Sequence, residues 1–219
     1  GVRYNVKSQA DPFEIYNATV DLQETNDLAL QMPALQQRMK AASLQVRRPN
    51  PTAPRPFDNE LVPALDAAPH ANGVEWKAYE GDYPWVPDLE ALKPVRSGTA
   101  ERPDPGKRTR DDNIGLLFSG CLSVPRDGDY TFYLQADTGA LLRLHDATVI
   151  DADFGYVGGQ EASGLIKLQA GLHPFRLFYA RRTGGKPALQ LSWSGPGIAK
   201  EIIPNDVFQR MAASPGAPK

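Results

Sequence analysis

Residues 129–146 read Asp-Tyr-Thr-Phe-Tyr-Leu-Gln-Ala-Asp-Thr-Gly-Ala-Leu-Leu-Arg-Leu-His-Asp, and this stretch decides the fold. Apolar side chains occupy every second position of two short runs; they are Tyr130, Phe132 and Leu134, then Leu142 and Leu144. Such alternation is typical of strands with one buried face. Between the runs, Asp137-Thr-Gly supplies turn residues, including a glycine that can take a positive φ. The stretch therefore predicts two strands that form a hairpin.

Four motifs in the second half of the chain carry a family resemblance. The first begins at Gly128 and reads Gly-Asp-Tyr-Thr-Phe-Tyr-Leu, and the second begins at Ala136 and reads Ala-Asp-Thr-Gly-Ala-Leu-Leu-Arg-Leu. The third begins at Gly158 and reads Gly-Gly-Gln-Glu-Ala-Ser-Gly-Leu-Ile-Lys-Leu-Gln-Ala-Gly-Leu-His-Pro. The fourth begins at Leu189 and reads Leu-Gln-Leu-Ser-Trp-Ser-Gly-Pro-Gly. Together they resemble the protective-antigen module, the PA14 domain, over residues 73–208. The resemblance implies a mainly β fold, an antiparallel two-sheet β-sandwich, and we assign residues 73–210 to it.

The apolar pattern also predicts the other strands of this domain. The clearest runs cover residues 114–124, 165–168, 174–179 and 188–193. The polar stretch 101–112 is predicted to be a solvated connector, and residues 181–187 an exposed hairpin loop. We interpret Trp76, Tyr79 and Trp85 as core aromatics, with sugar stacking by Trp85 as the alternative.

Residues 1–47 form a segment of a different kind. The pattern predicts a short N-terminal strand over residues 3–6 and a helix that begins at Pro33, because proline suits the first helical turn, and ends near residue 47. The segment resembles the extreme C-terminus of sulfatases, and the residues that carry this likeness are Tyr4, Asn5, Asp11, Pro12, Glu14, Asn17, Glu24, Asn26, Asp27, Leu28 and Ala29. The alternative is an unrelated strand and helix that flank the sandwich.

Residues 48–72 separate the two segments and are rich in proline. Proline denies the hydrogen bonds of helices and central strands, so we predict a semi-rigid linker. An ordered strap on the sandwich is the alternative, because Phe57, Leu61 and Val62 are apolar enough to dock. Residues 211–219 are predicted to be a disordered tail.

Composition restricts the partners of the chain. Its 219 residues carry a formal net charge of −2 with mixed signs, which leaves no sustained basic face for nucleic acid or anionic lipid. No apolar run approaches the ~20 residues of a membrane span.

The single cysteine, Cys121, lies in a strand pattern and is expected to be a buried thiol. We expect a C-terminal part of a longer sulfatase, which the resemblance places outside the cell or in the periplasm.

The sequence shows no catalytic set. Sulfatases need a cysteine or serine two residues before proline and four before arginine; near Ser123 the proline fits, but Asp127 stands where the arginine is required. His70, His145 and His173 are widely separated and lack zinc-ligand spacing. We therefore predict that this chain is not an enzyme.

The candidate ligand site follows the resemblance. In lectin-like members of the PA14 family, two adjacent aspartates at the position of Asp137 and Thr138 chelate calcium, and the ion grips vicinal sugar hydroxyls. Here the second carboxylate is replaced by Thr138, and calcium prefers a carboxylate-rich shell of ~6–8 oxygens. Asp151 and Asp153 are further candidate ligands, with turn caps as the alternative. We expect no cofactor, and calcium is disfavoured.

Two aromatic residues lie beside these carboxylates. Phe154 and Tyr156 offer rings that can stack on the apolar face of a sugar, or they cover the open end of the sandwich. The favoured hypothesis is a non-catalytic glycan-binding module that accompanies its own catalytic domain. The alternative is a structural or docking module that packs on that domain and binds no ligand.

Overall fold

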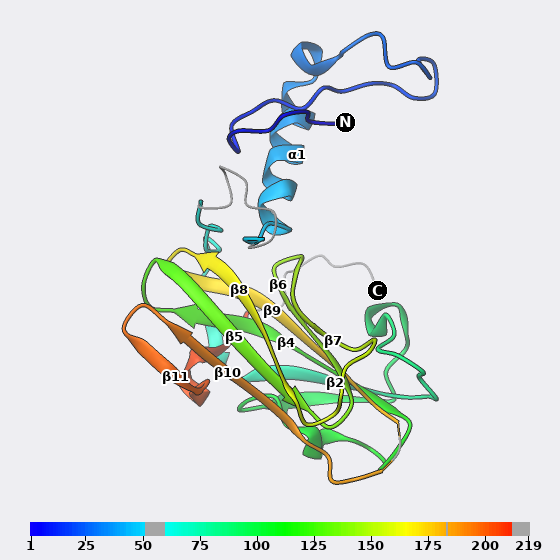
Figure 1. The fold of residues 1–219 in the computed structure, drawn as a ribbon, viewed down its shortest axis with the longest axis vertical. Helices are drawn as coiled ribbons and strands as arrows, with labels where there is room; N and C mark the ends of the chain where they lie inside the picture. The colour runs from blue at the N-terminus through cyan, green and yellow to red at the C-terminus, as the bar shows by residue number, and fades with distance from the viewer. Residues whose placement is uncertain (51–59, 183, 212–219) are drawn as a thin grey trace.

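The computed structural model describes residues 1–50, 60–182 and 184–211 and shows a two-sheet antiparallel β-sandwich with an N-terminal arm (Figure 1). The mainly β fold class expected from the sequence is confirmed. The strands are β1 (Pro69–Asn72), β2 (Val74–Glu80), β3 (Arg96–Ala100), β4 (Ile114–Val124), β5 (Gly128–Ala136), β6 (Gly139–Leu144), β7 (Ala147–Ala152), β8 (Glu161–Leu168), β9 (Gly171–Arg181), β10 (Leu189–Gly195), β11 (Ile198–Ile202) and β12 (Phe208–Met211). Short 3-10 helices are η1 (Ala29–Gln31), η3 (Leu89–Ala91), η4 (Pro105–Lys107) and η5 (Asn205–Val207).

The larger sheet has the strand order β1-β12-β4-β9-β6-β7, and β2 pairs with both β3 and β4. Strands β4 and β9 pair along their whole length and form its spine. The smaller sheet has the order β11-β10-β5-β8. Every pairing between named strands is antiparallel, as short loops between sequential strands allow.

The predicted hairpin over residues 129–146 is wrong in its pairing, although both strands exist. Strand β5 pairs with β8 and β10, whereas β6 pairs with β7 and β9, so the turn at Asp137 crosses from the smaller sheet to the larger. The loop after Arg181 likewise joins β9 of the larger sheet to β10 of the smaller one and is not a hairpin. Alternation shows that a strand has one buried face, but it does not identify the neighbouring strand.

Aromatic side chains from both sheets fill the core. The Tyr130 and Trp193 ring centroids are 5.8 Å apart, and those of Phe175 and Phe208 are 5.6 Å apart. These four side chains are almost completely buried. Because full burial of a large apolar side chain contributes roughly 1.5–3 kcal/mol, each of these four rings adds substantially to the stability of the sandwich.

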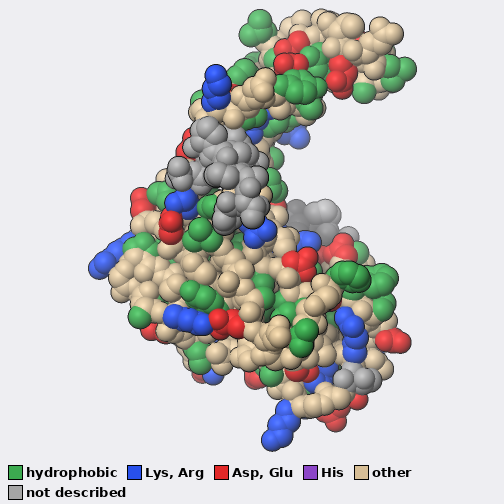
Figure 2. Space-filling view, viewed as in Figure 1, with side chains coloured by type: hydrophobic (Ala, Val, Ile, Leu, Met, Phe, Trp, Pro, Cys, Tyr) green, Lys and Arg blue, Asp and Glu red, His purple; other side chains and the backbone are tan. Residues whose placement is uncertain are grey.

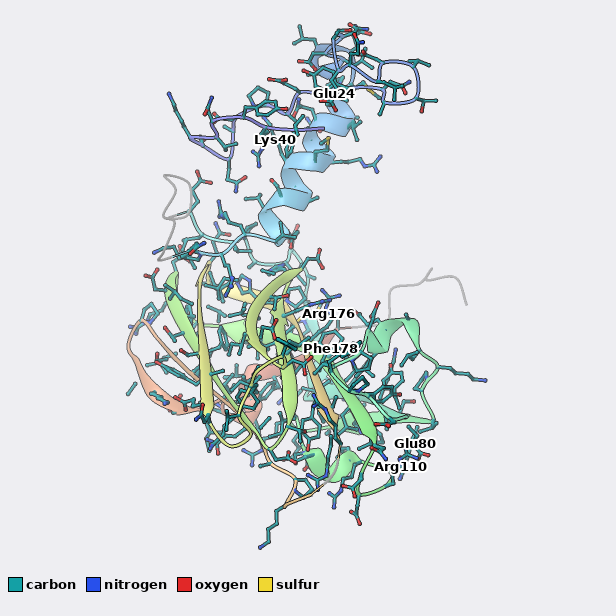
Figure 3. The ribbon with its side chains drawn as sticks, turned by 45° about the vertical axis from the view of Figure 1, so that its right-hand side comes forward. Glu24, Lys40, Glu80, Arg110, Arg176 and Phe178 are labelled. Carbon is teal, nitrogen blue, oxygen red and sulfur yellow. The ribbon has the colours of Figure 1, made fainter. Side chains whose placement is uncertain are left out.

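A second apolar cluster lies on the outer face of the larger sheet. Leu89 and Val86, in the segment between β2 and β3, cover Tyr79 and Phe178. Arg176, which shares the outer face of β9 with Phe178 (Figure 3), forms an ion pair of 3.1 Å with Glu90 in the same covering segment. The segment therefore shields one face of the sheet from water.

The N-terminal arm extends from one end of the sandwich (Figure 2). Its helix α1 (Pro33–Gln45) begins at the predicted proline, and none of its thirteen residues, all within the described part, is buried. The helix packs on the preceding segment, where the Gln36 side chain exchanges two hydrogen bonds with the Phe13 backbone, at 2.8 and 2.6 Å. The expected strand over residues 3–6 is reduced to a single bridge between Val2 and Glu14.

Few contacts join the arm to the sandwich. The Asp146 N–H donates to the Gln45 carbonyl at 2.9 Å, and Arg48 Nη1 donates to the Val149 carbonyl at 2.9 Å. Arg47 is buried, and its Nη1 lies 3.0 Å from Glu60 Oε2. These contacts reach the turn between β6 and β7, strand β7, and Glu60 in the segment described next.

The expected linker over residues 48–72 is described only in part. Residues 51–59 lie outside the described residues, as do residues 212–219 of the expected tail. From Glu60 onward the chain lies on the sandwich: the Val62 N–H donates to the Lys167 carbonyl and the Leu65 N–H to the Leu172 carbonyl, both at 2.8 Å. Val62 belongs to the core. The division of residues 1–72 into segment and linker stays a proposal.

Candidate functional site

The candidate residues gather at the end of the sandwich opposite the arm. Strand β6 starts at this end with Gly139 and finishes with Leu144, just before the turn that contacts α1. The ion pair between Glu80 and Arg110, 3.6 Å long, marks the same end in Figure 3. We call this region the loop end; its described residues are 81–88, 109–113, 137–138, 153–160, 182 and 184–188, together with Arg181 at the end of β9.

Asp137 has a partner for each of its carboxylate oxygens. Its Oδ1 accepts hydrogen bonds from the Tyr179 hydroxyl at 2.6 Å and from the Ala188 N–H at 3.0 Å. Its Oδ2 accepts a hydrogen bond from Arg181 Nη1. The Asp137 side chain is only 14% exposed, so this carboxylate is part of a buried ion pair.

Arg181 is the centre of this network. Its side chain is 3% exposed, and its Nε donates to the Asp111 carbonyl at 2.6 Å. Its Nη2 donates to the carbonyls of Gly184 and Gly185 at 2.6 and 2.9 Å. A charge buried to this degree is tolerated only when it is paired and fully hydrogen-bonded, and Arg181 meets both conditions.

The residues present do not fit a calcium ion at Asp137 and Thr138. The Asp137 oxygens already accept three hydrogen bonds, and the Thr138 hydroxyl donates to the Ala180 carbonyl at 2.8 Å. Calcium would have to displace the guanidinium and supply its charge. Across residues 1–50, 60–182 and 184–211, no three His, Cys, Asp or Glu side chains are grouped to hold a metal.

The structure separates the other two candidate carboxylates. Asp151 points outward from β7 and is exposed. Asp153 is mostly buried, and its Oδ2 accepts the Val86 N–H at 2.8 Å while its Oδ1 lies 3.5 Å from Arg182 Nη2. Asp153 therefore ties the loop that follows β7 to the loop that follows β2.

The two candidate aromatics also separate. Phe154 is fully exposed. Tyr156 packs against the core, and its hydroxyl lies 3.1 Å from both the N and the O of Ala136 and donates to the Gln160 carbonyl. Tyr156 covers the end of the sandwich, as the alternative interpretation of these two aromatics predicts. Of the two, only Phe154 is an exposed side chain.

Trp85 is not the core aromatic that the sequence suggests, because it is 61% exposed, whereas Trp76 and Tyr79 are buried as expected. Trp85 precedes Val86, and Phe154 follows Asp153, so the hydrogen bond between Val86 and Asp153 holds their two loops together. We call Trp85 and Phe154 the aromatic edge. These are the exposed aromatic side chains of the two joined loops.

Two histidines that are distant in sequence meet near the arm. His145 Nε2 lies 2.8 Å from His173 Nδ1, and His173 Nε2 lies 2.8 Å from the Gln169 carbonyl. His145 is in the left-handed region with φ 52°. Burial, and then the neighbouring His173, lower the pKa of His145 to about 4, and burial also lowers the pKa of His173. Both rings are therefore neutral at pH 7.

A separate cleft of about 1100 Å³ lies between β10 and β11 on one side and residues 99–107 on the other. Buried Leu191, Ile203 and Phe208 contribute to its lining, together with charged residues of both signs, which include Arg102 and Asp104. Such a mixed lining favours no particular charge on a ligand. The cleft is a rival location for a binding site.

Comparison with known families agrees with this architecture. The family model of the PA14 domain matches residues 70–207, from β1 to η5. The chain belongs to the PA14 domain family. A search of curated proteins finds no significant match. The PA14 match begins after the arm, so it does not bear on the sulfatase resemblance of residues 1–47.

Solved structures show the same PA14 fold at low sequence identity. The Epithelial Adhesin 6 A domain from Candida glabrata, in complex with Galb1-3GlcNAc, is 15% identical, with a TM-score of 0.52 over 68% of this chain and 91% of the adhesin domain. The Epithelial Adhesin 9 A domain, in complex with the same sugar, is 14% identical with a TM-score of 0.51 over 78% of this chain and 99% of that domain.

An anti-sigma factor domain-containing protein from Clostridium clariflavum is 23% identical to this chain, with a TM-score of 0.51 over 67% of it. The PA14 chain spans only about half the length of that protein, since 50% of it is covered. Identities this low establish the shared fold and nothing about ligands.

At this PA14 loop end, the structure differs from the favoured sequence interpretation at Arg181 and Trp85. The pattern predicts Arg181 in an exposed loop, because it begins a run of polar and glycine residues, yet it is the last residue of β9 and is buried. The favoured interpretation of Trp85 is a core aromatic, with sugar stacking as the alternative, and Trp85 is exposed. The stretch 101–112 was considered a solvated connector, yet its Asp111 carbonyl and Asp112 carboxylate face Arg181. The sequence signal that could have pointed to Arg181 is Asp137, a carboxylate in a turn, because a buried carboxylate needs a cationic partner.

Proposed function

We propose that this PA14 domain is a non-catalytic module that binds a carbohydrate through the aromatic edge of Trp85 and Phe154. The observation that carries the proposal is that these rings are 61% and 100% exposed on two loops fixed by the bond between Val86 and Asp153. Exposing large aromatic side chains on ordered loops costs hydration free energy, and sugars recover it by stacking their apolar faces on the rings.

Polar groups beside the aromatic edge are available for sugar hydroxyls. The Arg182 side chain is 42% exposed, and its Nη2 lies 3.5 Å from Asp153 Oδ1. Asp151 presents an exposed carboxylate on β7. Ligand sites combine aromatic side chains with a small number of polar or charged groups, and a guanidinium and a carboxylate are such groups. The two adhesin domains with this fold, both described in complex with Galb1-3GlcNAc, support a sugar as the ligand class.

We also propose that the arm connects this module to the catalytic domain of a longer, extracellular or periplasmic sulfatase. The proposal depends on the sequence resemblance of residues 1–47, and the position of the arm supports it. The arm contacts the turn after β6, whereas Asp153, which joins the two loops of the aromatic edge, lies beside Gly139 at the start of β6. A domain bound to the arm would therefore leave the sugar surface free. The module would then hold the enzyme near its glycan substrate.

A docking module that binds no ligand is the second candidate, and one observation favours it. The arm exposes apolar side chains at Val20, Leu22 and Leu30, with exposed fractions of 81, 85 and 98%. An apolar group of this size is expected to be covered by another protein surface. The arm could therefore provide the contact while the sandwich acts only as a spacer.

A glycan array with matched variants tests the proposal. Trp85→Ala and Phe154→Ala should each lower retention about tenfold, equivalent to ~1.4 kcal/mol, without changing the thermal midpoint. Ile202→Ala is the control, because Ile202 is an exposed apolar residue of the separate cleft. Retention lost only in the Ile202 variant would move the site to the cleft. No retention of the unmodified protein on any glycan would favour the docking module.

A further inference from the structure

Oxygen atoms from three separate loops converge on the guanidinium of Arg181. Carbonyl oxygens come from Asp111, before β4, and from Gly184 and Gly185, after β9. Carboxylate oxygens come from Asp137, after β5, and from Asp112, whose Oδ1 lies 3.6 Å from Nη2. Carbonyl and carboxylate oxygens gathered from several loops are the ligands that proteins offer to calcium.

We infer that Arg181 is a fixed internal cation that takes the place of a metal ion at the loop end. Its planar fork of five N–H donors satisfies several oxygens at once, which a lysine ammonium could not do in the same geometry. Burial opposes the charge, but the Asp137 carboxylate outweighs it, so the pKa of Arg181 is raised above its usual value. The cation is therefore covalently attached and permanently charged.

The position of Arg181 also supports the loop that carries Phe154. A Cβ on Gly158 would lie 2.1 Å from the Asp137 carbonyl oxygen, so this loop packs directly on the Asp137 backbone. The Gly159 N–H donates to the Ala136 carbonyl at 2.7 Å. Arg181 holds Asp137, and Asp137 supports the loop, so Arg181 is a positioning residue for the aromatic edge. Only this last step depends on the proposed function.

The experiment compares the calcium response of variants of the full chain. In the unmodified protein, millimolar calcium should leave the thermal unfolding midpoint unchanged and release no heat of binding in calorimetry. Arg181→Ala removes the guanidinium and leaves two carboxylates and three carbonyls without a cation. This variant should unfold at a lower temperature, and calcium should raise its midpoint by several degrees.

Matched variants distinguish the specific loss of the Arg181 charge from a non-specific loss of stability. Arg182→Ala is the control, because Arg182 is the neighbouring arginine and is half exposed, and it should show neither effect. Adding Asp137→Asn to Arg181→Ala should abolish the gained calcium response. Arg181→Lys keeps a positive charge, so it should lose part of the stability and remain insensitive to calcium.

Three results would overturn the inference. One is calcium binding by the unmodified protein that disappears in Asp137→Ala. Another is a folded Arg181→Ala protein that calcium does not stabilise. The third is an Arg181→Ala midpoint equal to that of Arg182→Ala. If Arg181→Ala does not fold, Arg181→Gln, which is neutral and of similar length, replaces it in every comparison. No sugar is used, so this test and the glycan array fail independently.

Discussion

At one end of strand β6 lies a buried charged cluster around Arg181, and at the other end lies a buried neutral pair, His145 and His173. The basic residues of both clusters, Arg181, His145 and His173, are each at most 4% exposed. The guanidinium of Arg181 finds an acceptor for each of its nitrogens, whereas the Nδ1 of His145 has no hydrogen-bond partner in the described structure.

The difference follows from the cost of burying charge. An unpaired buried charge costs far more folding free energy than a neutral polar atom without a hydrogen-bond partner. The charged cluster therefore needs a partner for each of its nitrogens, whereas the neutral pair tolerates one nitrogen without a partner. Arg181 stays charged, because its pKa is raised above the usual value, whereas the histidine pair is neutral at pH 7 and gains protons only in acid. The arm end, where the histidine pair lies, should therefore be weakened by acid.

The charged cluster should be the costlier one to disrupt. Asp137→Ala leaves the buried guanidinium without its closest counter-charge and should lower the free energy of unfolding by about 3–5 kcal/mol. Asp151→Ala, which removes an exposed carboxylate from a neighbouring strand, should change it by less than about 0.5 kcal/mol. Urea denaturation of both variants measures the contrast. Equal effects would show that Asp137 is not part of a buried pair.

The neutral pair should respond to pH instead. The folded pKa of His145, about 4, lies below its ordinary value of 6.5, so the unfolded chain binds protons more readily between these values. Stability should be complete above pH 6.5 and fall as the pH drops toward 4, by on the order of 2–3 kcal/mol.

Urea midpoints measured across this pH range test the dependence. A His145→Asn, His173→Gln double variant should give a flatter profile, since asparagine tolerates the positive φ of residue 145 and neither new side chain titrates. If the urea midpoint of the double variant falls with pH as steeply as that of the parent, other groups cause the acid sensitivity.

Within the loop end, one aromatic residue should affect stability and the other only binding. Tyr156→Phe removes a hydroxyl that contacts the backbone of Ala136 and Gln160, and should cost about 1 kcal/mol. Phe154→Ala changes a fully exposed side chain and should leave stability within about 0.5 kcal/mol. The reverse order in thermal unfolding would mean that Phe154 is packed in solution.

Removal of the arm should have the smallest effect on the sandwich. Deleting residues 1–46 keeps Arg47 and its contacts with the strap, and removes a helix with no buried residue. The remaining chain should unfold cooperatively with a midpoint within a few degrees of the parent. Loss of cooperative unfolding in calorimetry would show that the arm and the sandwich form one folding unit.

The sequence by itself determined most elements of this protein. Strand β4 occupies the predicted residues 114–124, and α1 begins at the predicted Pro33. Tyr130, Phe132 and Leu134 are all buried, as their alternation predicts. These features are local, because side-chain period and proline geometry act within a few residues of the chain.

Only the tertiary structure decided which sheet each strand joins and which residues form the loop end. Strands β5 and β6 are consecutive but lie in different sheets, and Asp137 meets Arg181 across 44 residues of sequence. The same packing places Tyr156 partly buried against the core and leaves Trp85 exposed. Pairing and burial depend on how two whole sheets stack, and a buried carboxylate specifies that a cation must approach it without specifying which one.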